Sequence, residues 1–448
     1  MELFGSSGVR ARALADLTPA DALKIAQAAG RVFDATRVAV ARDTRTTGPL
    51  FVNSVAAGLA SVGCDTDRLG VVPTPALQAF CEREGVPGVM ITASHNPPEY
   101  NGIKLVGTTG VELTRDGLEA VEARVGDTSL TDWAGAGTGQ TVEGAGRQYR
   151  EGVLRAVDRE RVAGADLTVA LDPGHGAGSV TSPRLFRELG CAVLTVNAQP
   201  DGRFPGRDPE PVAANLGDLR RLVRTTDADL GVAHDGDADR AMFVDERGEM
   251  IPGDVSLAAL AAAELGDGDV AVSAVNASQR LVDVVEEAGA RLRTTPIGST
   301  HIITAIRDIQ AAGGSVPVAG EGNGGLLFPD YRVARDGAYT AARFLELVAE
   351  RPASRVVADY DGYHNVREKV GYEDEDERAT LLAAVEAVAE WADAELDTTD
   401  GYRLEFADGW VLARPSGTEP VVRVYAEARD PGRARELAAL FLDALETA

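Results

Sequence analysis

The segment GVMITASHNP, residues 88–97, decides how this chain is expected to fold. Its first four residues are apolar and predict a short buried strand, and the pair Pro97-Pro98 ends any regular element. Ser94 is therefore expected on a stiff loop at the carboxyl end of a strand, where open α/β sheets place their ligands. A serine-containing turn that only reverses the chain is the alternative interpretation of these residues.

Length and composition indicate a globular protein with several domains. At about 150 residues for each domain, the 448 residues suffice for about three. No apolar run approaches the ~18 residues of a membrane-spanning helix, and the first residues lack the basic and apolar parts of a signal peptide. The three cysteines, Cys64, Cys81 and Cys191, are far apart, which favours free buried thiols in a reducing compartment. We therefore expect a soluble cytoplasmic protein.

The formal net charge of −26 argues against nucleic acid and anionic membranes as partners. Lysine occurs only at Lys24, Lys104 and Lys369, and arginine supplies the other positive charges. Such an acidic, lysine-poor surface is typical of halophilic proteins, because high salt screens the self-repulsion. Lys104 follows Ser94 closely, and lysine, unlike arginine, can exchange a proton. Its retention there indicates a chemical role.

Strand-like and helix-like segments alternate through most of the chain, as in α/β proteins. A stretch rich in glycine, threonine and alanine, residues 131–146, is interpreted as a linker, and a strand is expected at 316–318. The last part of the chain predicts an acidic helix, two strands separated by a turn and a closing helix from Pro431. The predicted domains are residues 1–147, 148–248, 249–353 and a smaller α+β domain at 354–448.

The sequence DGDADR, residues 235–240, directly follows a predicted strand. Asp235, Asp237 and Asp239 would repel one another unless a cation lies among them, and hard oxygen ligands of this kind suit Mg²⁺. A solvated acidic loop is the alternative in so acidic a protein. A calcium-binding loop is excluded, because Arg240 stands where that loop needs a glycine.

Two further loops carry polar groups suited to a phosphorylated sugar. RPSGTEP, residues 414–420, followed by Arg423, combines a rigid turn, hydroxyl groups and arginines, which suits a phosphate dianion. In GEGNGG, residues 320–325, Glu321 and Asn323 are the kinds of groups that hydrogen-bond sugar hydroxyls. A plain turn is the alternative for each loop. For residues 414–420 the net charge of −26 favours the phosphate site, because an anionic substrate needs a concentrated positive site against that charge.

Taken together and in this order, these segments and FGSSGVR (residues 4–10) resemble the α-D-phosphohexomutase superfamily over essentially the whole chain. The resemblance implies three related α/β domains with mixed sheets and a smaller C-terminal α+β domain around a central cleft, to which each domain contributes one loop. It also implies an isomerase that interconverts hexose 6-phosphate and hexose 1-phosphate through a phosphoserine enzyme and a bisphosphorylated sugar.

The resemblance assigns a role to each matching residue. Ser94 would be the phosphorylated serine and, with Asp235, Asp237 and Asp239, a ligand of one Mg²⁺. Lys104, Arg10 and Arg240 would line the reaction centre. From its position next to Ser94, and not from the resemblance, His95 is expected to shape the loop or contact the phosphate. Glu321 and Asn323 would bind the sugar, and the distal phosphate would be held by Arg414, Ser416, Gly417, Thr418 and Arg423.

The resemblance also suggests substrates and partners. Glucosamine phosphate is the favoured substrate, with mannose or glucose phosphate as the alternative and a hexose bisphosphate as activator. A Mg²⁺-dependent sugar phosphatase and an inactive sugar-phosphate sensor are less favoured, and the protein is expected to be a monomer or homodimer. Many bacterial members carry a histidine where this chain has Gly325, which leaves the second proton donor unassigned.

Overall fold

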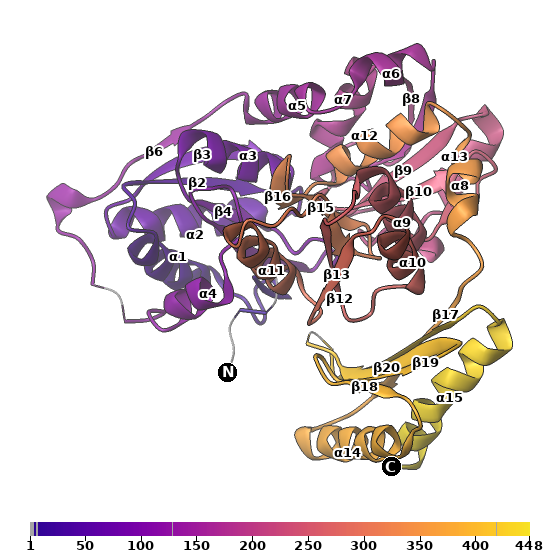
Figure 1. Ribbon diagram of the computed structural model, residues 1–448. Coiled ribbons are helices and arrows are strands. Elements are labelled where there is room, and N and C mark those ends of the chain that lie inside the picture. Colours follow the sequence, from indigo (N-terminus) through magenta and orange to yellow (C-terminus); the bar gives the residue numbers. More distant parts are fainter. Residues whose placement is uncertain (1–3, 6–7, 128, 418) are drawn as a thin grey trace.

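Four β-sheets follow one another along the chain (Figure 1). This computed structural model describes residues 4–5, 8–127, 129–417 and 419–448. The sheets contain six, five, five and five strands, and we call each sheet with its helices a unit. The predicted fold class, three α/β units followed by a smaller C-terminal unit, is confirmed.

The first unit has a mixed sheet of order β1-β5-β4-β2-β3-β6. Part of the segment interpreted as a linker, residues 131–146, is instead the edge strand β6, which pairs in parallel with β3. All three residues of β6 are exposed, so no alternation of apolar residues marked it as a strand. The strands are β1 (Val9–Arg12), β2 (Arg37–Arg42), β3 (Asp65–Val71), β4 (Gly88–Ile91), β5 (Tyr100–Val106) and β6 (Gly139–Thr141), and the helices are α1 (Pro19–Phe33), α2 (Gly48–Ser61), α3 (Thr74–Glu84), α4 (Arg115–Glu122) and the 3-10 turn η1 (Trp133–Gly135).

In the second unit, the acidic sequence 235–240 joins two fully buried antiparallel strands, β9 and β10. The burial of both strands carries the three aspartates into the protein interior. The strands are β7 (Thr168–Asp172), β8 (Ala192–Thr195), β9 (Leu230–His234), β10 (Ala241–Asp245) and β11 (Met250–Ile251), and the helices are α5 (Ala145–Arg155), α6 (Arg159–Gly164), α7 (Ser182–Glu188), α8 (Gly217–Thr226) and the turns η2 (Ala177–Val180) and η3 (Ala213–Asn215).

In the third unit, residues 322–324 connect β14 to β15. The strand expected at 316–318 is wrong: the strand begins at Ala319, and Pro317 lacks the N–H that a central strand needs. The strands are β12 (Val270–Ala274), β13 (Arg291–Thr295), β14 (Ala319–Glu321), β15 (Gly325–Phe328) and β16 (Arg332–Arg335), and the helices are α9 (Gly253–Glu264), α10 (Gln279–Glu287), α11 (Ser299–Ala311), α12 (Gly337–Val348), α13 (Ala353–Val357) and the turn η4 (Ala358–Tyr360).

The fourth unit is an antiparallel sheet of five strands, not the two strands that the sequence predicted. The expected closing helix is α15, which begins at Pro431. The strands are β17 (His364–Gly371), β18 (Glu395–Asp397), β19 (Tyr402–Phe406), β20 (Gly409–Pro415) and β21 (Val421–Ala428), and the helices are α14 (Glu375–Trp391) and α15 (Pro431–Thr447).

The cores of these units differ in how they connect. One buried apolar cluster runs through the first three units, whereas the fourth has a core of its own. A small cluster of Val275, Trp410 and Leu412 joins the third and fourth units, and Figure 1 shows the fourth sheet set apart from the other three. The three cysteines are buried free thiols. Among the described residues, no helix has the length and apolarity needed to cross a membrane.

Candidate active site

Ser94 lies three residues beyond β4, in a left-handed conformation with φ of +52°. This conformation is uncommon for a residue with a side chain, and such strain persists only where the surroundings enforce it. Here the backbone N–H of Ser94 donates to Thr92 Oγ1 at 2.9 Å, and Thr92 in turn donates to Asp43 at 2.7 Å. The buried Ser94 hydroxyl then donates to Asp235 Oδ2 at 2.7 Å. The loop therefore aims the serine at the acidic sequence.

Arg45, which sequence reasoning missed, holds this loop from behind. Its side chain is fully buried, and its Nε donates to Asp43 Oδ2 at 3.0 Å. Its two terminal nitrogens donate to four backbone carbonyl oxygens of the loop, at 2.6 to 2.9 Å: those of Ser94, Asn96, Pro97 and Tyr100. The only sequence signal was an arginine two residues after an aspartate at a strand end.

The three aspartates converge as predicted, with one oxygen of each within 4.8 Å of the others. Asp237 Oδ2 accepts from Thr74 Oγ1 at 2.5 Å and from Lys104 Nζ at 2.8 Å. Asp239 Oδ2 accepts from Lys104 Nζ at 2.9 Å. The Oδ1 atoms of Asp237 and Asp239 are buried and have no hydrogen-bond partner among the described residues.

Such unpartnered buried carboxylate oxygens are costly, and their arrangement fits a bound cation. Burial, together with repulsion from Asp239 and Asp237, raises the pKa of Asp235 to about 8. A divalent cation with a preference for oxygen, such as Mg²⁺, would relieve both the missing partners and the repulsion. The donor set of Asp235, Asp237 and Asp239, with the Ser94 hydroxyl beside it, therefore fits Mg²⁺.

Lys104 is buried on β5 and lies between two of these carboxylates. Burial opposes its charge, but Asp237 and Asp239 outweigh that effect and raise the pKa of Lys104. The sequence argument relied on a lysine that can give up a proton; the structure holds it as a cation. Arg10 and Arg240 lie nearby, and the Nε atom of each is buried without a hydrogen-bond partner in the part of the chain described. These N–H groups suit an anion.

His95 lies beside the Ser94 hydroxyl. Its Nδ1 lies 3.4 Å from Ser94 Oγ. The positive charge of Arg240, then burial and the charge of Arg10, lower the pKa of His95 well below its ordinary value. The imidazole is therefore neutral at physiological pH.

Glu321 and Asn323 lie next to the acidic sequence. Asn323 Nδ2 donates to Glu321 Oε2 at 3.2 Å, and its Oδ1 accepts from the N–H of Gly325 at 3.0 Å. The N–H of Ala241, at the start of β10, donates to the carbonyl of Gly324 at 3.0 Å. The third unit thus brings its loop against the second unit. It also brings Arg335, a residue that sequence reasoning missed, to 2.8 Å from Asp239 Oδ2.

The predicted phosphate loop lies elsewhere, at the turn between β20 and β21. Arg414 pairs with Asp400 at 3.0 Å and Arg423 with Glu419 at 2.6 Å. Ser416 bonds through its N–H to Val421, Gly417 follows it, and Thr418 lies outside the described residues. Within the described chain, no hydrogen bond or ion pair joins Arg414 or Arg423 to Ser94 or the three aspartates.

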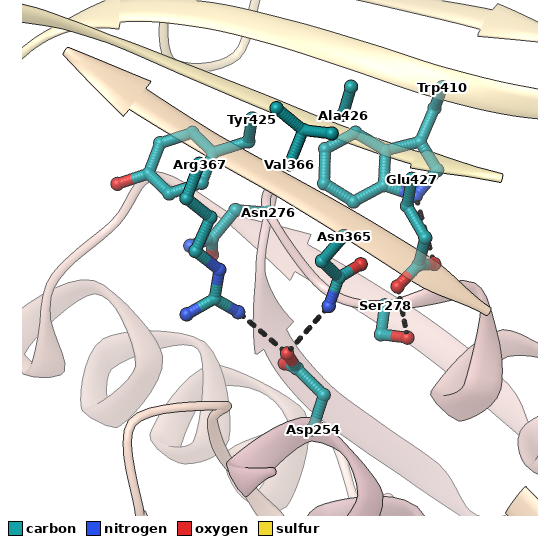
Figure 2. A pocket seen from close by; sticks show the side chains of 10 residues that line it. All are labelled: Asp254, Asn276, Ser278, Asn365, Val366, Arg367, Trp410, Tyr425, Ala426 and Glu427. Atoms are coloured by element: carbon teal, nitrogen blue, oxygen red, sulfur yellow. Dashed lines mark hydrogen bonds and ion pairs between the residues drawn. The ribbon is translucent and has the colours of Figure 1, made fainter. Parts of the chain in front are cut away.

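Polar contacts dock the fourth unit on the third (Figure 2). Glu427 of β21 accepts hydrogen bonds at the start of α10, from the Ser278 hydroxyl at 2.7 Å and the Gln279 N–H at 2.6 Å. Asp254 of α9 pairs with Arg367 of β17 at 2.7 Å. The fourth unit therefore meets the third through these polar contacts and through the small apolar cluster of Val275, Trp410 and Leu412.

Known proteins are similar to this chain over all four units. The chain matches the four parts of one family: Phosphoglucomutase/phosphomannomutase, alpha/beta/alpha domain I over residues 1–131, domain II over 147–248, domain III over 252–363 and the C-terminal domain over 369–444. A probable phosphoglucosamine mutase of Methanopyrus kandleri is 42% identical over 447 residues, 98% of this chain and 97% of that protein. A phosphoglucomutase/phosphomannomutase of Thermococcus kodakarensis is 39% identical, covering 100% of this chain and 99% of that one.

Among solved structures, a phosphoglucomutase/phosphomannomutase family protein of Burkholderia thailandensis superposes with a TM-score of 0.85 at 28% identity, covering 100% of this chain and 97% of that chain. The predicted resemblance is confirmed. The chain belongs to the phosphoglucomutase/phosphomannomutase family of mutases.

Proposed function

We propose that this chain interconverts hexose 6-phosphate and hexose 1-phosphate through a phosphoserine at Ser94 and a bisphosphorylated sugar. The observation that carries the proposal is the buried contact of the Ser94 hydroxyl with Asp235, at 2.7 Å, beside two aspartates that each present an oxygen with no hydrogen-bond partner among the described residues. Phosphoryl transfer depends mainly on positioning and charge neutralisation, and this site offers both.

Asp235, Asp237, Asp239 and phosphorylated Ser94 would hold Mg²⁺, which supplies positive charge to the phosphoryl oxygens when bound. The buried N–H groups of Arg10 and Arg240 donate to the same oxygens. Neutral His95 adds a hydrogen-bonding group beside Ser94 without adding charge.

In the transfer step, the bond between phosphorus and Ser94 Oγ breaks and a bond to the sugar hydroxyl oxygen forms. Lys104 is the proposed proton carrier: it enters as a cation, gives its proton to Ser94 Oγ and regains one from the attacking hydroxyl. The reverse transfer, from the other end of the bisphosphate, restores phosphorylated Ser94. A hexose bisphosphate would charge the enzyme initially and act as its activator.

Transfer between the two ends of one sugar requires a second phosphate site and a sugar that can turn. Glu321 and Asn323 are proposed to bind its hydroxyls, and the distal phosphate would contact the loop that contains Arg414, Ser416, Gly417, Thr418 and Arg423. The separate core of the fourth unit supports this assignment, because that unit can shift without disturbing the core of the other three.

Glucosamine phosphate is the favoured substrate, with mannose and glucose phosphates as the alternatives. The name of the Methanopyrus kandleri relative supports the first, and that of the Thermococcus kodakarensis relative supports the others. We also propose that the protein is cytoplasmic and halophilic, and that it is a monomer or homodimer. Its buried thiols and its net charge of −26 are consistent with the first two proposals.

A side-by-side assay of glucosamine, mannose and glucose 6-phosphates tests the function, with the matching bisphosphate, Mg²⁺ and high KCl. We expect a hexose 1-phosphate as product, a mass increase of one phosphate on the protein, and loss of both in Ser94→Ala. Release of inorganic phosphate would indicate a sugar phosphatase. Binding of the sugar phosphate without turnover would indicate a sensor.

A further inference from the structure

Gly325, at the start of β15, leaves space for a side chain that comes from the neighbouring strand. A Cβ atom at this position would lie 2.9 Å from Cδ of Arg335, which ends β16, and 3.1 Å from Asn323 Oδ1. The backbone of Gly325 is not in the left-handed region, so space rather than conformation accounts for the glycine. The Arg335 side chain can therefore follow this path only because residue 325 is a glycine.

The far end of Arg335 is fixed at the acidic sequence. Its Nη2 lies 2.8 Å from Asp239 Oδ2 and 3.6 Å from Glu112 Oε1 of the first unit. All three side chains are buried, and Lys104 Nζ donates to the same Oδ2 of Asp239. These contacts leave Asp239 Oδ1 without a hydrogen-bond partner among the described residues, with Arg240 Nε 3.9 Å away. Arg335 thus joins the third unit to the other two at the proposed reaction centre.

The backbone strengthens this junction. Two residues after Arg335, the N–H of Gly337 donates to the carbonyl of Ala238, between two of the aspartates, at 3.2 Å. A Cβ at Gly337 would lie 2.2 Å from the carbonyl oxygen of Arg240, so the two segments are in direct contact. Any movement of Arg335 is therefore transmitted to the acidic sequence.

Arg335 also adds to the positive charge around the three aspartates, where Arg10, Lys104 and Arg240 already lie. A phosphoryl group carries close to two negative charges and is stabilised in transfer by such a cluster. Arginine does not exchange protons in proteins, so Arg335 contributes charge and position and leaves proton transfer to other groups.

We propose that Arg335 is a further positioning residue of the phosphoryl transfer, and that Gly325 is required because Arg335 crosses it to reach Asp239. This inference rests on the proposed function. The side chain orients Asp239 by pairing with Oδ2, and it ties the loop containing Glu321 and Asn323 to the acidic sequence. Its removal should impair the chemical step more than the binding of the sugar.

A double-mutant cycle of Gly325→Ala and Arg335→Ala tests whether the effect of residue 325 on catalysis depends on Arg335. Loss of one preorganised charged donor costs about 10²-fold in kcat, which we expect for Arg335→Ala with little change in KM. Gly325→Ala should lower kcat at least about tenfold while Arg335 is present, and far less when residue 335 is alanine, because contacting sites are not additive. Arg335→Lys should recover part of the kcat lost in Arg335→Ala.

Gly325→Ala could also act by displacing Asn323. That effect would change KM, and it would be the same whether residue 335 is arginine or alanine, which distinguishes it from an effect through Arg335. Arg332→Lys, on the same strand but paired with Glu82 at 2.9 Å, is the matched control and should keep the wild-type kcat. Circular dichroism verifies folding, and Arg335→Thr replaces Arg335→Ala if the latter does not fold.

Equal effects of Gly325→Ala on kcat in both backgrounds would overturn the inference, as would wild-type kcat in Arg335→Ala. Either of these two outcomes would refute only the role of Arg335, and the proposed function would stand as long as the wild-type protein converts a hexose phosphate and carries a phosphoserine. Failure of the wild-type protein in both measurements would instead refute the proposed function, and the inference with it.

Discussion

Replacement of Arg45 by lysine should damage both stability and turnover, although it keeps the positive charge. The Arg45 side chain donates five hydrogen bonds, one to Asp43 and four to carbonyls of the Ser94 loop. A lysine has three donors, so at least two of these five acceptors lose their partner. Each lost hydrogen bond is worth a net ~1 kcal/mol, and up to ~3 kcal/mol where a buried group is left unsatisfied. With two bonds lost, Arg45→Lys should lower the free energy of unfolding by about 2–6 kcal/mol.

The same change should displace the serine. Ser94 is held in a strained conformation, and its own carbonyl is one of the four that Arg45 binds. A displacement of about 1 Å at a reacting group costs about 10²-fold in rate, which sets the expected loss in kcat.

Urea unfolding at high KCl and steady-state kinetics measure the two effects. The control is Arg37→Lys, because Arg37 is partly exposed and pairs with Asp67 at 3.2 Å and Glu84 at 3.2 Å. It should change stability by no more than ~1 kcal/mol. A variant Arg45→Lys that matches this control in both stability and kcat would refute the argument that Arg45 holds the loop.

Four more perturbations give separate checks. Chelation of divalent cations should abolish turnover and added Mg²⁺ should restore it, since two buried carboxylate oxygens have no hydrogen-bond partner in the described part of the chain; full turnover in excess chelator would contradict the metal assignment. Glu427→Gln should loosen the fourth unit, because breaking a buried ion pair such as Glu427–Arg280 costs ~3–5 kcal/mol; unchanged limited proteolysis between residues 357 and 364 would argue against this docking role. Burial raises the pKa of the Cys191 thiol to about 12 and that of Cys81 further still, so these thiols stay protonated at pH 8. A thiol reagent should accordingly label the cysteines only after unfolding, and rapid labelling of the native protein would be the contrary result. Stability should rise with KCl concentration, because the net charge of −26 is self-repelling; a stability independent of KCl would exclude halophilic adaptation.

Local patterns predicted a loop serine, a carboxylate cluster and alternating strands and helices, and the resemblance carried by several such segments in order predicted the family and the site residues. An apolar run followed by a serine and two prolines predicted a loop at a strand end, and the structure has β4 and Ser94 there. Alternating aspartates after a buried strand predicted a carboxylate cluster, and their oxygens converge. Such signals need no knowledge of distant residues, because each depends on neighbours in the chain.

The tertiary structure decided what surrounds these residues. Arg45 meets the carbonyl of Ser94 across 49 residues of sequence, and Arg335 meets Asp239 from another unit. Neither partner can be found from local pattern, because a buried arginine is stable only where acceptors from distant segments surround it. The edge strand β6 escaped prediction for a related reason, since its pairing with β3 and not its own residues makes it a strand. The sequence by itself therefore determined the local loops that carry the groups proposed for the chemistry, and long-range packing determined how those groups are held.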